Sequence, residues 1–162
     1  MLTILQADLQ QVQHANDLLL MLNTYATDPM GGGEPLSDFV QKNLIAELKK
    51  RPGIRGFLAY ENDLAVGFAI CIEGFSTFAC KPLLNIHDFG VHPAFRGQGI
   101  AKKLLRFISD FAQTEGYCKI TLEVLQGNGP AHALYLDQGF TSYELNPSMG
   151  GAIMMQKKFV QR

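Results

Sequence analysis

The chain has 162 residues, of which 47% are hydrophobic and 18% charged, and its formal net charge is −1. This composition is typical of a soluble globular protein, and the length suits a single domain over residues 1–162. A nearly neutral chain has no overall field that would attract nucleic acid or an acidic membrane, so we expect neither partner. No apolar run approaches the roughly 20 residues that span a bilayer, and the first residues lack the pattern of a signal peptide. We therefore expect a cytoplasmic protein.

The first half of the chain is predicted to contain a strand, two helices and three further strands. We expect strands over residues 2–6, 55–60, 64–73 and 83–91, a helix after Asp8, and a second helix capped by Ser37. Residues 28–35 lie between the helices, and their two prolines and three glycines indicate a loop. Glu61-Asn62-Asp63 is expected to be a three-residue hairpin loop.

The second half is predicted to alternate helices with strands. We expect a long helix from Ile100, a strand over 119–125, a shorter helix through Asp137, and strands over 140–145 and 152–159. The order β-α-α-β-β-β-α-β-α-β-β predicts an α/β (α+β) fold. Its mixed central sheet would have about seven strands, with helices on both faces.

The stretch from Val91 to Ala101 joins the strand over 83–91 to the long helix, and it contains Arg96, Gly97 and Gly99. Glycine lets the backbone approach a ligand closely, because it has no Cβ. The first turn of a helix also offers N–H groups without intrahelical acceptors, at the positive end of the helix dipole. A guanidinium beside such a turn favours an anion, most often a phosphate.

Two motifs indicate which phosphate ligand this is. Arg96-x-x-Gly99-x-Ala101 is similar to the R/Q-x-x-G-x-G/A signature of the GNAT superfamily of acetyl-CoA-dependent N-acetyltransferases. A second stretch resembles the N-x-x-A-x-x-x-Y-x-x-x-G-F signature of the same superfamily and runs from Asn128 through Tyr135 to Phe140. The resemblance covers nearly the whole chain. It implies transfer of an acetyl group from acetyl-CoA to a primary amine, by direct attack in a ternary complex and without a metal.

The resemblance also implies which residues bind the CoA. The pyrophosphate would rest beside Arg96, on the backbone N–H groups of Gly97, Gln98, Gly99, Ile100 and Ala101. The pantetheine would pair with backbone groups of Phe89 and Val91, where their strand parts from its neighbour. Gly90 between them would allow a close approach of the ligand, or it would mark a bulge.

Asn128 and Tyr135 share one helical face, because their spacing of seven residues is two turns. The resemblance implies that Asn128 bonds the pantetheine and that Tyr135 presents its phenol to the departing sulfur. The structural alternatives are an N-cap for Asn128 and a core aromatic for Tyr135.

Acetylation of an amine also needs a base, because an alkylammonium near pKa 10.4 must lose a proton before it attacks. We favour Glu123, which we place in the middle of its strand. Asp88 and His87 are the rival bases. A buried carboxylate that only bonds backbone N–H groups is the structural alternative.

The acceptor is expected at the loop over 28–34, where Asp28 and Glu34 would attract a cationic amine; a mobile surface turn is the alternative. This loop is distant in sequence from the phosphate turn, so we expect it to have little effect on CoA affinity. A small-molecule amine is the favoured acceptor. A protein N-terminus or lysine, and a CoA-binding regulatory module without turnover, are the alternatives. The oligomeric state is left open, with a homodimer as one option.

Overall fold

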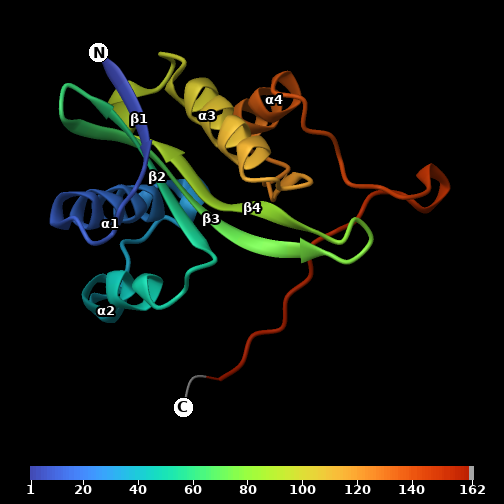
Figure 1. The fold of residues 1–162 in the computed structure, drawn as a ribbon, viewed down its shortest axis with the longest axis horizontal. Helices are drawn as coiled ribbons and strands as arrows, with labels where there is room; N and C mark the ends of the chain where they lie inside the picture. Colours follow the sequence, from blue (N-terminus) through green and yellow to red (C-terminus); the bar gives the residue numbers. More distant parts are fainter. Residues whose placement is uncertain (161–162) are drawn as a thin grey trace. The chain divides into compact units, whose positions relative to one another are not determined.

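The computed structural model describes residues 1–160, and the chain divides into two compact units between Leu122 and Glu123. The first unit holds a sheet with helices packed on it, and the second holds a single α-helix (Figure 1). The single domain over residues 1–162 stays a prediction. None of the helices among residues 1–160 is long and apolar enough to cross a membrane.

The sheet has five strands, whose order in space follows their order in the chain. They are β1 Leu2–Gln6, β2 Ile54–Glu61, β3 Leu64–Ser76, β4 Lys81–Val91 and β5 Ile120–Leu122. The first four strands are antiparallel, whereas β5 runs parallel to β4. Parallel neighbours need a crossover, and helix α3 (Ile100–Thr114) supplies it.

The β2–β3 hairpin is tighter than the sequence predicts. Glu61 is the last residue of β2 and pairs with Leu64, so the loop contains only Asn62 and Asp63. Both residues have positive φ, 48° and 69°. This is the conformation of a type I′ turn, and Asn and Asp are the non-glycine residues that tolerate it best.

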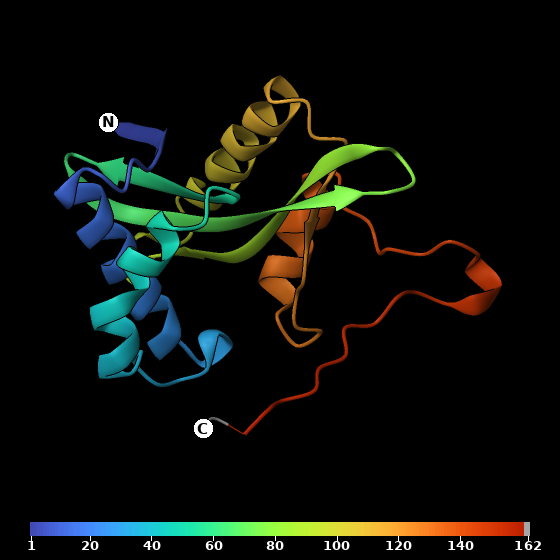
Figure 2. The ribbon, with the colours of Figure 1, turned by 60° about the horizontal axis from the view of Figure 1, so that its bottom comes forward.

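Helices cover both faces of the sheet in the first unit, as predicted (Figure 2). On one face, α1 (Val12–Thr27) and α2 (Asp38–Lys49) share a core with the sheet that includes Leu18, Met21, Leu48, Leu58 and Phe68. On the other face, the ring of Phe111 in α3 packs edge-on against Phe57, with 5.1 Å between the ring centroids. Because successive side chains of a strand alternate, Phe57 and Leu58 reach opposite faces.

The helix starts are only partly as predicted. Ser37 caps α2, because its hydroxyl accepts the N–H of Val40 at 3.3 Å. Asp8 does not cap α1, which begins at Val12. Its carboxylate instead accepts the N–H of Gln10 at 2.9 Å and closes a turn before the helix.

The prediction of about seven strands is wrong for the residues that the structure describes. The second unit contains the predicted helix, α4 (Gly129–Asp137), but residues 140–145 and 152–159 form no strand. A hydrogen bond from the N–H of Ala152 to the C=O of Tyr143, at 2.8 Å, joins the two segments. An apolar pattern shows that a segment suits a strand, but a strand also needs a ladder of backbone partners.

Gly90 in β4 should be sensitive to any side chain. A Cβ at this position would lie 3.0 Å from Cε1 of Phe68 and 3.2 Å from Cδ2 of Tyr25. We expect Gly90→Ala to lower the free energy of unfolding by about 1–3 kcal/mol, as overpacking of a core usually does. Urea denaturation measures this change. Gly53→Ala is the control, because its Cβ would lie 3.6 Å from that of Glu73, and equal midpoints for the two variants would contradict the prediction.

Candidate functional site

The turn between β4 and α3 has the backbone geometry of an anion site. Gly97 and Gly99 both have positive φ, 77° and 76°, which L-residues with side chains rarely adopt. Gly99 is the N-cap of α3 and brings no side chain to cap the first N–H groups of the helix. A Cβ at either glycine would meet nothing within 4 Å. The glycines therefore serve the backbone conformation and leave open space beside it, which fits a bound pyrophosphate.

The start of α3 is anchored to the sheet by Ile100. Its side chain is buried against Ala59 and Val66. A Cβ at Gly67 would lie 3.3 Å from Cγ2 of Ile100, so the glycine in β3 lets the helix start sit this close to the strand. Because the side chain of Ile100 belongs to the core, only its backbone N–H is suited to a ligand.

Strand β4 leaves its parallel neighbour before it reaches this turn. Its pairing with β5 extends from Leu84 to Ile86, whereas β4 itself continues to Val91. The bulge in β4 lies at His87, because Asp88 and Ile86 pair with successive residues of β3. Gly90 does not mark the bulge, which lies elsewhere, and the groups closest to its missing Cβ are the rings of Phe68 and Tyr25; close approach of a ligand at this glycine stays a prediction.

In the part of β4 beyond Ile86, alternate residues direct their backbone N–H and C=O groups away from β3. The N–H of His92 bonds to the C=O of Val66 in β3, at 2.8 Å. Alternate residues of an antiparallel strand direct their N–H and C=O groups to opposite sides. Phe89 and Val91 therefore direct theirs away from β3, which is where an extended ligand would pair.

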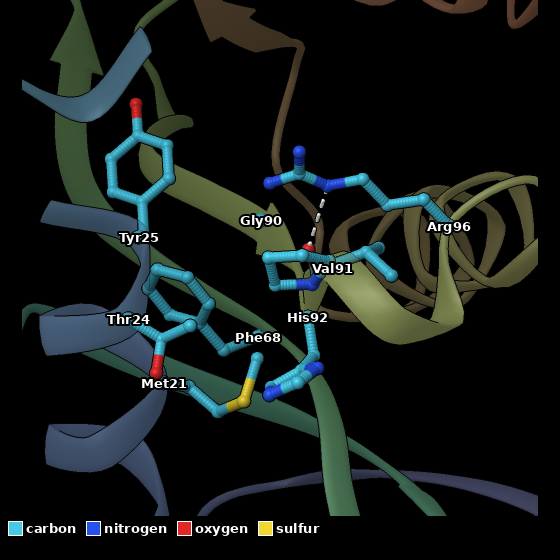
Figure 3. A pocket seen from close by; sticks show the side chains of 9 residues that line it. Met21, Thr24, Tyr25, Phe68, Gly90, Val91, His92 and Arg96 are labelled. Atoms are coloured by element: carbon cyan, nitrogen blue, oxygen red, sulfur yellow. Dashed lines mark hydrogen bonds between the residues drawn. The ribbon is translucent and has the colours of Figure 1, made fainter. Parts of the chain in front are cut away.

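A small pocket lies beside this strand end, between α1, the sheet and the turn (Figure 3). It is lined by Met21, Thr24, Tyr25, Phe68, Gly90, Val91, His92, Pro93 and Arg96. The sequence analysis did not single out Tyr25 and His92 as site residues. Tyr25 lies in the last turn of α1, next to the loop expected to receive the acceptor. This position in the sequence could have predicted Tyr25 as a site residue.

Arg96 is bonded to two groups around this pocket. Its Nη2 forms an ion pair with Oδ2 of Asp28 at 2.8 Å, and its Nε donates to the C=O of Val91 at 3.2 Å. Figure 3 shows the side chain extending back over Val91. The loop and the phosphate turn, which are distant in sequence, are therefore in direct contact. Helix α1 packs along β4 and brings residues 68 positions apart into contact.

Asp28 is held firmly as a carboxylate. Its Oδ1 accepts the N–H of Met30 at 2.9 Å, and this bond and then the Arg96 guanidinium hold the pKa of Asp28 below its usual range. Its side chain is 15% exposed. Glu34, the other predicted acceptor residue, is exposed, and its backbone N–H bonds to the C=O of Ala26.

Asp88 lies on β4 and is half-buried. Burial raises the pKa of its carboxyl, and His87 partly offsets that rise. The pKa of the Tyr25 phenol is raised as well, first by burial and then by the charges of Asp88 and Asp28. Two carboxylates thus act on the Tyr25 phenol, and the Arg96 guanidinium in the same pocket neutralises one of them, Asp28.

The remaining predicted residues lie in the second unit. Asn128 caps α4, because its Oδ1 accepts the N–H of Ala131 at 3.3 Å. Tyr135 is buried, and its ring packs edge-on against Phe140 with the centroids 5.8 Å apart. Glu123 is exposed and follows the end of β5, so its placement in the middle of a strand is wrong. The ladder with β4 that would have extended the strand ends at Leu122.

The raised pKa of Asp88 predicts a pH-dependent stability. Because the folded protein binds this proton more tightly than the unfolded chain, the free energy of unfolding falls as pH rises through the folded pKa. Asp88→Asn removes that effect. We expect the variant to gain stability over the wild type at neutral pH and to lose this gain below the ordinary pKa of 3.8. Urea unfolding over a pH series tests this, and a difference independent of pH would contradict it.

Comparison with known proteins gives this geometry a context. Residues 19–140 match the model of the acetyltransferase (GNAT) family. Over 89 residues the chain is 37% identical to streptothricin acetyltransferase of Streptomyces lavendulae, covering 55% of this chain and 44% of that protein. Over 83 residues it is 37% identical to [ribosomal protein bS18]-alanine N-acetyltransferase of Haemophilus ducreyi, covering 49% and 51%. The chain thus spans about half the length of the curated relatives it matches.

The fold is similar to solved structures over nearly its whole length. One is an aminoglycoside acetyltransferase from an uncultured soil metagenomic sample, in complex with sisomicin. The TM-score is 0.77 at 17% identity, over 98% of this chain and 96% of the other. At this level of identity the likeness concerns the fold alone.

Proposed function

Because the chain belongs to the GNAT family of acetyltransferases, we propose that it is an enzyme that transfers an acetyl group from acetyl-CoA to a primary amine. The observation that carries this proposal is the turn around Gly97 and Gly99. It combines left-handed glycines, open space beside them and the N-terminus of α3, and it lies within the matched stretch. These features suit the pyrophosphate of CoA.

In this proposal the CoA lies along the end of β4. The N–H groups from Gly97 to Ala101 hold the pyrophosphate, and Arg96 adds a charged donor. The pantetheine pairs with the backbone of Phe89 and Val91 like an added strand, because β5 has already left β4 at Ile86. Asn128 and Tyr135 contribute from the second unit, as the family motif implies.

The reaction is a direct attack of the neutral amine on the thioester carbonyl. The nitrogen forms a bond to the carbonyl carbon, the carbon–sulfur bond breaks, and the amine proton leaves to a base. A backbone N–H near Phe89 or Val91 stabilises the oxyanion. The phenol of Tyr135 protonates the departing thiolate, so that the products are an amide and free CoA thiol.

Asp88 is the better candidate for the base. It is half-buried on β4, and burial brings its pKa nearer to the working pH, which suits a general base. Glu123 is exposed and follows a strand end, so we now keep it as the alternative. His87, at the bulge, is exposed and beside Asp88.

We propose a small cationic amine as the acceptor. The carboxylates of Asp28 and Asp88 act on Tyr25 and suit an ammonium once Arg96 is drawn away, and the pocket is small. A protein N-terminus is the second candidate, because the chain is similar to an enzyme that acetylates the alanine of a ribosomal protein. The cytoplasmic location stays a prediction, and the oligomeric state stays open.

Release of CoA thiol from acetyl-CoA, measured across a panel of amines, tests the proposed function. The panel contains alkyl diamines, amino sugars and peptides with a free N-terminus. We expect turnover with small amines; turnover with peptides alone would favour the second candidate. Binding of acetyl-CoA without turnover would identify a regulatory module instead.

Arg96→Ala should weaken CoA binding about tenfold to a hundredfold, because it removes a charged hydrogen bond to phosphate.

The pH dependence of kcat/KM separates the two candidate bases. A base is idle when protonated, so activity falls toward acidic pH through its pKa. We expect Asp88→Asn to remove this acidic limb and to lower activity, while Glu123→Gln keeps it. The reverse pattern would give the role to Glu123. An unchanged limb in both variants would leave proton removal to His87 or to water.

Tyr135→Phe tests the acid. The substitution keeps the ring and its packing against Phe140 and removes only the phenolic oxygen and its hydrogen. We expect turnover to fall about 10²-fold, the usual scale of general acid catalysis, with CoA affinity nearly constant. Wild-type turnover under conditions where acyl transfer limits the rate would leave Tyr135 with a structural role.

A further inference from the structure

The Arg96 side chain joins the loop over 28–34 to the phosphate turn, and its contacts involve groups proposed to bind both substrates. Arg96 would bind the pyrophosphate, yet its Nη2 holds Asp28, the carboxylate proposed for the amine. Its Nε also holds the C=O of Val91, a backbone group proposed for the pantetheine. One guanidinium thus engages groups proposed for two different substrates.

These contacts compete with the ligands. The carbonyl of Val91 faces the side where an extended pantetheine would pair, and the guanidinium lies over that stretch of β4 (Figure 3). Arg96 uses Nε for Val91 and Nη2 for Asp28, which together form one edge of its planar fork. A bidentate contact of this edge with a phosphate of CoA requires the Arg96 side chain to change partners.

Asp28 can bind another cation when the Arg96 guanidinium leaves it. Oδ1 of Asp28 stays bonded to the N–H of Met30, which holds the carboxylate in place when the guanidinium leaves. With its side chain only 15% exposed, the carboxylate then lacks a nearby counter-ion, and Asp88 adds to the negative potential at Tyr25. A substrate ammonium can take the position of the guanidinium.

We propose that Arg96 is a latch that makes amine binding depend on acetyl-CoA. Acetyl-CoA draws the guanidinium from Asp28 and Val91 to its pyrophosphate, and the vacated Asp28 then binds the ammonium of the acceptor. This inference rests on the proposed function and adds to it the side chain that couples the two binding sites. Because coupling is reciprocal, bound amine also strengthens the binding of acetyl-CoA.

The affinity of CoA for Asp28→Asn, measured by calorimetry, tests the latch. Asparagine can keep its oxygen on the N–H of Met30, but its NH₂ group then faces the guanidinium and cannot accept a bond. Freed of this competitor, Arg96 should bind CoA about threefold to tenfold more tightly than in the wild type. Asp28→Ser, which can also cap Met30, should behave in the same way.

Two controls isolate the latch from a general effect of charge. Glu34→Gln removes the other carboxylate of the loop, and its effect on CoA affinity reports long-range charge alone. In an Arg96→Ala background, Asp28→Asn should change CoA affinity no more than Glu34→Gln does. Dephospho-CoA keeps the pyrophosphate and should show the same tightening as CoA. Tightening with CoA alone would overturn the pyrophosphate as the destination of the guanidinium.

The outcomes separate this inference from the proposed function. Wild-type protein that does not bind CoA would overturn the proposed function. Wild-type protein that binds CoA, with equal or weaker binding in Asp28→Asn and Asp28→Ser, would overturn the latch and leave the function standing. A structure with CoA bound and the Arg96–Asp28 pair still at 2.8 Å would have the same meaning.

Discussion

Strand β4 has different partners along its two edges, and this difference underlies the candidate site. Toward β3 it is paired as far as Val91, whereas toward β5 its pairing stops at Ile86. Beyond Ile86 the strand has no β-ladder on this edge among residues 1–160. In the proposal the pantetheine takes this edge. The edge paired with β3 continues to Val91, close to the start of α3, which Ile100 holds against Ala59 and Val66.

Charge is distributed around this strand end in an uneven way. The charges of Asp28 and Asp88 act on Tyr25, and the start of α3 contributes the positive end of its dipole at the turn. A cationic amine and an anionic cofactor are thus favoured at adjacent places. Arg96 lies between them, and its choice of partner links the two.

The features that the sequence could predict are those set by neighbours in the chain. The N-cap role of Ser37 and the glycine turn after β4 depend on a few consecutive residues, and both are present. Features set by distant contacts were missed. The pairing of Asp28 with Arg96 follows from the packing of α1 along β4, which no local pattern encodes.

The ends of the strands were equally hard to predict. Residues 119–125 have the pattern of one apolar strand, but β5 contains only Ile120–Leu122, where its pairing with β4 ends. Glu123 was placed within the sheet for this reason and is exposed instead. The sequence marked Gly90 as a position that needs glycine. In the structure, the space for a side chain at Gly90 is taken by the rings of Phe68 and Tyr25, which come from separate elements.

The length of α1 constrains how proteins with this architecture can vary. Its 16 residues, about 24 Å of helix, set where Asp28 arrives at the turn. Insertion of one residue within the helix would rotate everything beyond it by about 100° and advance it by about 1.5 Å, and Asp28 would then point away from Arg96. The loop after Met30 is also tied to this helix, because a Cβ at Gly31 would collide with the backbone C=O of Tyr25 and the N–H of Glu34 bonds to the C=O of Ala26. The helix therefore behaves as a spacer of fixed length for the ion pair and for the first residues of the loop.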